Sequence, residues 1–252
     1  MSESFVLILV ISLIGYVLYK KNKNDAIREQ LERQENIDLI SRVTPIFRGT
    51  STERFLILNL LKYGINSGAI FHDLYIYKPD RKTSQIDIVV ATSVGIIVFE
   101  VKDYSGWIYG KGNEQKWTQV LSYGREKHRF YNPVLQNKSH IAQLQRILKE
   151  TVPFYSVIVF YGNCRLEDIS FIPQNTFVTK HYRVIDVIES ILQNNPVANY
   201  KNKHNVINIM DGYFIIPFKI QIDTFITERL VISMALAATP PLGWNSWNTF
   251  SH

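Results

Sequence analysis

The sequence predicts an α/β domain, in which helices cover a β-sheet, preceded by an N-terminal transmembrane helix. Strand-like and helix-like segments alternate along the chain, without an internal repeat, as is typical of α/β or α+β domains. The chain has 252 residues, of which 46% are hydrophobic and 20% charged, so it is long enough to bury a substantial core. The prediction of a membrane helix comes from an uncharged apolar run over residues 5–19.

This apolar run, FVLILVISLIGYVLY, would be about 22 Å long as a helix, which is shorter than a bilayer core of about 30 Å. To span the bilayer, it would have to thin the membrane or recruit flanking residues. Glu3 precedes the run and Lys20, Lys21 and Lys23 follow it, the opposite of the charge order in a cleaved signal peptide. We therefore interpret residues 1–20 as an uncleaved membrane anchor, rather than a signal peptide or a buried helix, with the rest of the chain in the cytoplasm.

Residues 21–45 are polar and helix-prone, and they are predicted to link the anchor to the domain. The single cysteine, Cys164, excludes an intrachain disulfide and fits a reducing compartment. A structural zinc site is not expected, because paired Cys or His spacings are lacking. The formal charge of +6 and the pI of about 9.2 suit a phosphate-bearing partner or an anionic membrane surface, although a solvated lysine-rich face would account for them nearly as well.

The domain opens at Gly49 with a helix. Thr50 and Glu53 form a capping-box pattern, and the apolar residues after them continue until Gly64. Glu53 can therefore be a cap residue or a functional carboxylate. The remaining elements follow from apolar runs and cap signals. Strands are expected over residues 69–77, 85–91, 96–102, 107–112 and 155–161, and helices over residues 134–149 and 184–192.

The strands at 85–91 and 96–102 are predicted to form a hairpin that brings two carboxylates together. If residues 92–95 form an even-numbered turn, Ala91 faces Ile96. In the same register Asp87 faces Glu100 and Gln85 faces Lys102, and all four of these side chains share one face of the sheet. The opposite face is wholly apolar and must be covered by helices; it comprises Ile86, Ile88, Val90, Ile97, Phe99 and Val101.

Facing carboxylates destabilise a sheet unless something offsets their repulsion. A divalent cation such as Mg²⁺ would do so, because it binds carboxylate oxygens and keeps water at its other positions. The alternative is a surface ion pair of Lys102 with Asp87 or Glu100. We favour the metal, because the charges interrupt strands that are otherwise apolar on both faces, where unpaired burial would cost several kcal/mol.

The segment from Asp87 to Glu100, Val101 and Lys102 resembles the D-x(n)-E-x-K signature of restriction-endonuclease-like nucleases. The wider context resembles the nuclease-related domain family, NERD. The matching features are Gly49 with Glu53, QID at 85–87, VGIIVFEVKDYSGWIYG at 94–110, Trp117 and NPVLQNKSHIAQL at 132–144. This resemblance implies a restriction-endonuclease-like core with a central mixed sheet flanked by helices.

The resemblance also implies a reaction, the metal-dependent hydrolysis of phosphodiester bonds in nucleic acid, and DNA rather than RNA as substrate. In the family, the residues matching Asp87 and Glu100 hold Mg²⁺, with Mn²⁺ as an alternative, and the carbonyl of Val101 is a further ligand. The residue matching Lys102 positions or deprotonates the attacking water and counters charge on the phosphorus centre. Glu53 would be an additional metal or water contact.

Contacts to the substrate are less defined in the sequence. Asn132 and Gln136 match a polar family motif without an assigned role, and helix capping is an equal alternative for Asn132. Gln85 would contact phosphate or simply end its strand. A basic and aromatic segment could follow a nucleic-acid backbone and stack on bases, although scattered surface charge with core aromatics is the commoner arrangement. It comprises Trp107, Tyr109, Lys111, Lys116, Trp117, Tyr123, Arg125, Lys127, His128 and Arg129.

The predicted organisation is an anchor over 1–20, a linker over 21–45, a NERD nuclease-like domain over 46–165, an extension of that domain over 166–233, and a tail over 234–252. The tail contains TPPLGWNSWNTF, which resembles the opening of α-galactosidase-type glycoside hydrolases. Its nineteen residues cannot build a barrel that needs about 200 or more. We therefore expect no glycosidase activity.

Overall fold

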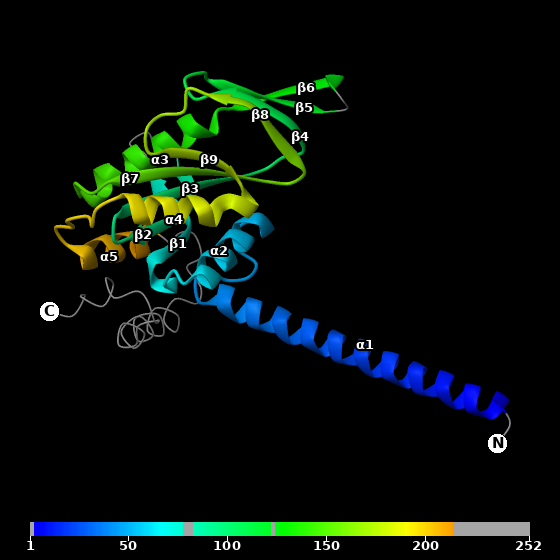
Figure 1. Ribbon diagram of the computed structural model, residues 1–252. Coiled ribbons are helices and arrows are strands. Elements are labelled where there is room, and N and C mark those ends of the chain that lie inside the picture. The colour runs from blue at the N-terminus through cyan, green and yellow to red at the C-terminus, as the bar shows by residue number, and fades with distance from the viewer. Residues whose placement is uncertain (1–2, 78–82, 122–123, 214–252) are drawn as a thin grey trace.

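The computed structural model describes residues 3–77, 83–121 and 124–213 (Figure 1). The predicted tail over 234–252 and the last part of the predicted extension lie outside the described residues.

A single long helix, α1 (Glu3–Ser41), replaces the predicted anchor and most of the predicted linker. Within its second half, residues 26–35 (AIREQLERQE) are nearly all strong helix formers, so the chain continues as a helix without a break. Figure 1 shows α1 projecting away from the rest of the protein. Within the described part of the chain, no helix has an apolar stretch long enough to cross a membrane. The predicted transmembrane helix over residues 5–19 therefore has no support from the described part of the chain.

The first helix of the domain, α2 (Ser51–Tyr63), begins and ends as predicted. The hydroxyl of Thr50 accepts a hydrogen bond from the backbone N–H of Glu53 at 3.2 Å, so Thr50 is the N-cap. Gly64 ends the helix in the left-handed region with φ of 105°, where glycine is favoured.

The first sheet has the strand order β1-β2-β3-β7-β9. Strands β1 (Ile70–Tyr77), β2 (Thr83–Thr92) and β3 (Gly95–Asp103) are antiparallel, whereas β7 (Phe154–Tyr161) and β9 (Thr176–Lys180) continue the sheet in parallel. A short 3₁₀ helix, η1 (Ser67–Ala69), leads into β1. The sheet is therefore mixed, as the family resemblance implies.

A second sheet has the order β6-β5-β4-β8, so the prediction of one central sheet is incomplete. Only β4 (Gly106–Lys111) corresponds to a predicted strand. Strands β5 (Lys116–Leu121), β6 (Glu126–Tyr131) and β8 (Cys164–Ser170) were not predicted. They carry polar residues on every second position or more, because one face of this sheet is open to solvent.

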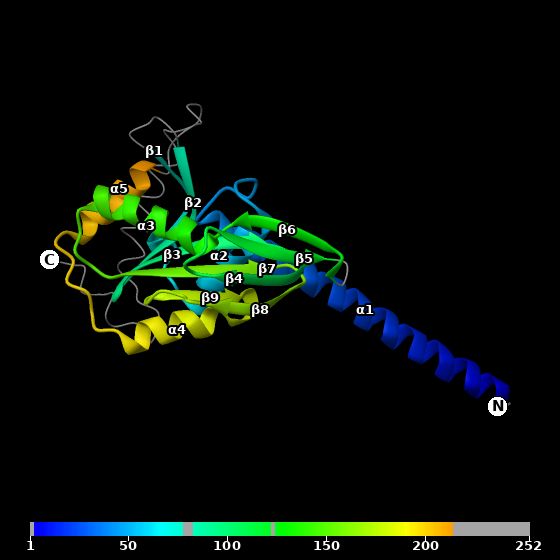
Figure 2. The same cartoon turned by 90° about the horizontal axis from the view of Figure 1, so that it is seen from above.

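Helices cover both faces of the first sheet (Figure 2). Helix α2 and α4 (Val184–Asn194), which follows the short η3 (His181–Arg183), pack on one face. Helices α3 (Pro133–Leu148) and α5 (Lys203–Tyr213) pack on the other face. A third cluster, around Ile108, Trp117 and Phe160, fills the space between the two sheets. The fold is therefore a mixed α/β fold.

Most of the predicted apolar face of the hairpin lies under α2 and α4. Ile88, Val90, Ile97, Phe99 and Val101 belong to that cluster. The prediction is wrong for Ile86, which packs on the opposite side with the α3 and α5 cluster. In the neighbouring strand β1, Asp73 lies between the paired residues His72 and Leu74 with φ of 56°, and this interrupts the alternation of side chains at the level of residue 87.

Candidate active site

The β2–β3 hairpin has the predicted register, but its ladder ends one pair before the two carboxylates. Thr92 pairs with Gly95, and the pairing continues to Ile88 and Phe99, which confirms the even-numbered turn. Beyond that pair, the carboxylate of Asp87 accepts the backbone N–H of Val101 at 2.7 Å. A side chain thus takes the place of a backbone acceptor, and the strands part where the charged residues begin.

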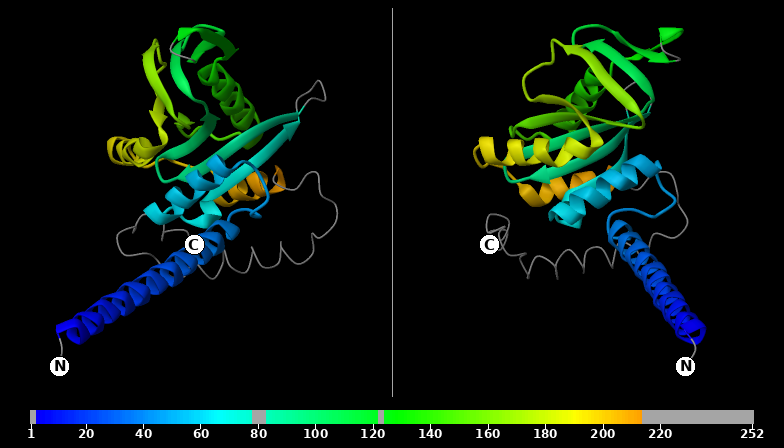
Figure 3. Two further views of the ribbon diagram at one scale, coloured as in Figure 1. Left: turned by 90° about the vertical axis from the view of Figure 1, so that its right-hand side faces the viewer. Right: turned by 45° about the vertical axis from the view of Figure 1, so that its right-hand side comes forward.

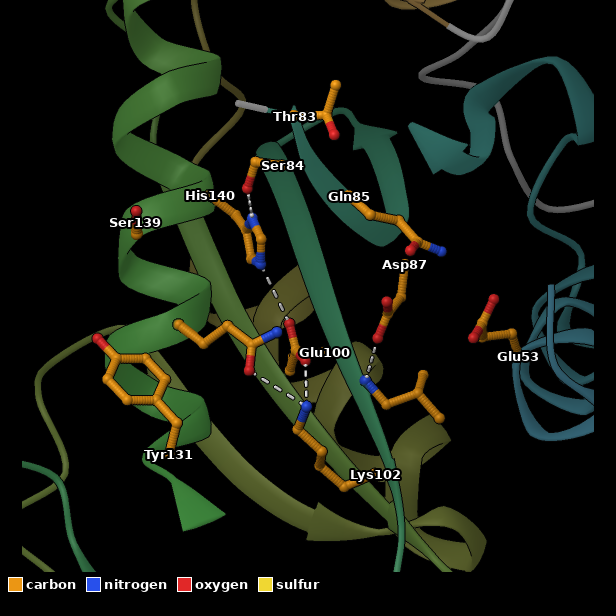
Figure 4. A pocket seen from close by; sticks show the side chains of 12 residues that line it. Glu53, Thr83, Ser84, Gln85, Asp87, Glu100, Lys102, Tyr131, Ser139 and His140 are labelled. Atoms are coloured by element: carbon orange, nitrogen blue, oxygen red, sulfur yellow. Dashed lines mark hydrogen bonds and ion pairs between the residues drawn. The ribbon is translucent and has the colours of Figure 1, made fainter. Parts of the chain in front are cut away.

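A pocket of about 540 Å³ opens at this point. Its walls come from α2, β2, β3, α3 and the end of β6 (Figure 4). The lining residues are mostly polar: Glu53, Thr83, Ser84, Gln85, Asp87, Glu100, Val101, Lys102, Tyr131, Gln136, Ser139 and His140. All four residues predicted to be catalytic therefore line one pocket.

Glu53 enters the pocket from the first turn of α2 (Figure 4) and is buried. One carboxylate oxygen accepts from the Thr50 hydroxyl at 2.8 Å, and the other lies 2.8 Å from Nε2 of His72. The second ring nitrogen of His72 lies 2.9 Å from the hydroxyl of Thr44. Burial alone would raise the pKa of Glu53. Hydrogen bonds from His72 and Thr50, together with the charge of His72, nevertheless hold that pKa below its ordinary value. Glu53 is therefore both part of a capping turn and an ionised carboxylate of the pocket.

Asp87 has the opposite electrostatic balance. Burial, and then repulsion by the nearby charge of Glu100, raise the pKa of Asp87 to about 8. The hydrogen bond from the Val101 N–H and the charge of Lys102 act in the other direction, but they are too weak to offset these effects. Ionisation of both carboxylates in this buried space is therefore unfavourable.

Glu100 and Lys102 form a buried ion pair rather than a surface one. Glu100 is only 1% exposed, and Nζ of Lys102 donates to its Oε1 at 2.6 Å. Lys102 also donates to the side-chain oxygen of Gln136 on α3 at 3.2 Å. Gln136, whose role the sequence left open, thus holds Lys102 against the carboxylates.

His140 is a site residue that the sequence analysis missed. Its Nδ1 lies 3.2 Å from the hydroxyl of Ser84, and its Nε2 lies 3.4 Å from Oε2 of Glu100 (Figure 4). Both His140 Nε2 and Glu100 Oε2 are buried without a hydrogen-bond partner. The available signal was helical spacing, because His140 lies four residues after Gln136 and so shares its helix face.

The other predicted contacts fall into two groups. Gln85 lines the pocket, but its amide donates to Asp73 at 2.6 Å instead of facing Lys102.

Two of the predicted contact residues, Trp117 and Asn132, lie outside the pocket. Trp117 is fully buried between the sheets, with its indole N–H bonded to the carbonyl of Lys111. Asn132, also fully buried, caps α3 by accepting from Val134 N–H. Its amide donates to the carbonyls of Lys111, Gly112 and Glu114. The capping alternative is therefore correct for Asn132.

The donor set suits a hard cation with few protein ligands. Asp87 and Glu100 supply carboxylate oxygens, one of which, Glu100 Oε2, is buried without a hydrogen bond, and the Val101 backbone lies beside them. No group of three His, Cys, Asp or Glu side chains in the described residues is arranged to hold a metal. Mg²⁺ accepts this number of ligands, because it commonly uses one or two carboxylates and keeps several waters. The residues present therefore fit Mg²⁺ better than a metal that requires a full protein cage.

The central part of the chain is similar to a known protein family. Residues 48–161 match the family model of the nuclease-related domain, which confirms the resemblance found in the sequence, and placement in the restriction-endonuclease-like superfamily is consistent with the match. An uncharacterized protein of Bacillus anthracis is 29% identical over 177 residues, which make up 69% of this chain and 82% of that protein. No solved structure matches the chain significantly.

Proposed function

We propose, from the match of residues 48–161 to the nuclease-related domain, that the chain is a Mg²⁺-dependent nuclease that hydrolyses phosphodiester bonds of nucleic acid. The observation that carries the proposal is the burial of Asp87 beside Glu100 in a polar pocket, with Lys102 on the same side. Such an arrangement costs stability unless a cation joins it, and perturbed carboxylates in a pocket are typical of functional sites. DNA as the substrate, and Mn²⁺ as an alternative metal, follow from the family resemblance.

In this proposal Asp87, Glu100 and the carbonyl of Val101 hold the metal. A bound Mg²⁺ would polarise a phosphoryl oxygen and lower the pKa of a bound water. Binding would also favour the ionised form of Asp87, because the cation offsets the repulsion between the two carboxylates.

The remaining residues would position the reactants and stabilise charge. Lys102, held by Glu100 and Gln136, carries a positive charge at the side of the pocket where negative charge on the phosphate grows. Glu53 is kept ionised by His72 and Thr50, so its oxygens can accept a hydrogen bond from the attacking water.

Cleavage of labelled single-stranded and duplex DNA and RNA by the purified chain tests this proposal, with Mg²⁺, Mn²⁺ or EDTA present. We expect cleavage with either metal, none in EDTA, and a loss of at least about 100-fold in Asp87→Asn, Glu100→Gln and Lys102→Met. Asp103→Asn removes an exposed carboxylate of the same strand and is the matched control. Circular dichroism would establish that each variant is folded.

Absence of cleavage with both metals would refute the enzymatic role, as would wild-type rates in the three site variants. Binding of nucleic acid without cleavage, unaffected by EDTA or by Lys102→Met, would instead identify a non-catalytic binding module that retains the nuclease fold.

A further inference from the structure

The second sheet has an inner face and an outer face of different character. Ile108, Trp117 and Phe130 point inward to the cluster between the sheets. Because side chains alternate along a strand, their neighbours in β4, β5 and β6 point outward. We call the following six residues the outer face: Trp107, Tyr109, Lys116, Lys127, Arg129 and Tyr131.

The strand register arranges the outer face in rows that each combine a cation with an aromatic ring. Val120 pairs with both Trp107 and Lys127, so these two side chains lie in one row across three strands. Thr118 pairs with both Tyr109 and Arg129 and defines the second row.

The third row, which pairs Lys116 directly with Tyr131, is the row nearest the pocket. Tyr131 is 53% exposed and lines the pocket beside Lys102 (Figure 4). Tyr131 is the last residue of β6, so the strand extends from the pocket back along its partner β5. Figure 3 shows this pair of strands, in green, at the edge of the protein. At about 3.3 Å per residue, Lys127 lies about 13 Å further along, a span of about four nucleotides at 3.4 Å per nucleotide.

The cations of the outer face are available for a ligand. Lys116, Lys127 and Arg129 are exposed, and within the described ranges none of them has a salt-bridge partner. Charges on an edge strand such as β6 also discourage pairing with other chains. That role does not account for Trp107, which is 37% exposed, or for Tyr131, because exposed aromatic rings favour association.

We propose that the outer face binds single-stranded nucleic acid and leads it into the carboxylate pocket. Lys116, Lys127 and Arg129 would contact phosphates, while the aromatic side chain of each row offers a surface on which an unpaired base can stack. Rows of this kind suit unpaired strands, because the faces of bases in a duplex are already stacked on each other. This inference rests on the proposed function for what happens in the pocket, but the binding itself needs no cleavage.

Fluorescence anisotropy with a labelled single-stranded DNA in EDTA tests the role of the cations. The double variant Lys127→Gln/Arg129→Gln should reduce the slope of log affinity against log salt by about 1.4, since each phosphate contact to a single strand contributes about 0.7. Arg28→Gln/Arg33→Gln on the exposed part of α1 removes the same charge elsewhere and should leave the slope unchanged. Equal slopes for the first double variant and the wild type would overturn the proposal.

The aromatic contribution is tested by Trp107→Ala, which should weaken binding by about 5- to 100-fold. Trp107→Phe should recover most of the affinity, because it restores a ring. On an abasic oligonucleotide, Trp107→Ala and the wild type should bind equally, whereas a folding defect would weaken binding to both ligands. Tighter binding of duplex than of single strands would refute the preference for unpaired strands. Because all these binding measurements are made without metal, their results do not depend on whether the protein cleaves nucleic acid.

Discussion

Replacement of Asp87 by asparagine should stabilise the metal-free protein at neutral pH. With a pKa of about 8, the Asp87 carboxyl must keep a proton in the folded state at pH 7, and the amide removes this cost, while its carbonyl oxygen can still accept the N–H of Val101. The variant thus separates the cost of the buried charge from the hydrogen bond that joins β2 to β3.

The size of the effect follows from proton linkage. The pKa of Asp87 is about 8 in the folded chain, against an ordinary value of 3.8. Between these values the folded state binds one proton more than the unfolded state, so the free energy of unfolding falls as pH rises, by about 1.4 kcal/mol per pH unit. From pH 5 to pH 7, Asp87 should therefore remove about 3 kcal/mol of stability, and this loss should be absent in Asp87→Asn.

Urea unfolding in EDTA at pH 5, 6 and 7 measures this difference. Other groups titrate in both proteins, so the quantity of interest is the difference between the two pH dependences, with Asp103→Asn as a control for loss of an exposed carboxylate. Parallel pH dependences for the wild type and Asp87→Asn would refute the argument, because Asp87 would then titrate as an ordinary exposed carboxylate.

Three further predictions concern the metal and the frame of the pocket. Mg²⁺ at ten times its dissociation constant should stabilise the wild type by about 1.4 kcal/mol, seen as a higher melting temperature, and Glu100→Gln should respond less; an equal response would place the metal elsewhere. Gly49→Ala should cost more stability in urea unfolding than Gly124→Ala. Both glycines have a positive φ, but a Cβ would overlap other atoms, the His72 ring and Glu53, only at Gly49. Equal losses of stability would contradict this contact. Asn132→Ala should lower the free energy of unfolding by about 2–4 kcal/mol, because it removes the cap of α3 and leaves buried carbonyls unpaired. Asn132→Ser keeps the cap and should lose less. Identical urea midpoints for the two variants would contradict the capping role.

Four strands of the first sheet, β1, β2, β3 and β7, could be predicted because they contain long apolar runs, whereas the short β9 was not predicted. The strand YSVIVFY and the hairpin around residues 92–95 have no competing helical pattern, and both are present as expected. Strands β5, β6 and β8 are only six or seven residues long, and polar residues make up half or more of each. Such short, half-exposed strands resemble loops until the inner cluster around Trp117 shows which side chains are covered.

The site was predictable as far as local spacing and the family signature extend. Glu53, Asp87, Glu100 and Lys102 all reached one pocket, and Gln136 acquired a contact. Its histidines could not be found in the same way. His72 meets Glu53 and His140 meets Glu100 only through packing of α2 and α3 on the sheet, and the helical spacing of His140 from Gln136 gives its helix face but not its partner. Trp117 was misassigned because an aromatic residue beside basic residues resembles a stacking platform, whereas its strand parity directs it inward.

The parallel pairing of β3 with β7 has a consequence for the order in which the protein matures during synthesis. Ile96 has its partner at Phe154, so the chain must grow well beyond the charged residues before β3 gains its second neighbour. At about 5–20 residues per second, that interval lasts about 3–12 s. Meanwhile β3 would present an unpaired edge, apolar on both faces, to other nascent chains. A fragment that stops before β7 would contain every residue that lines the pocket and would still expose this edge, so its expected fate is aggregation rather than weak activity.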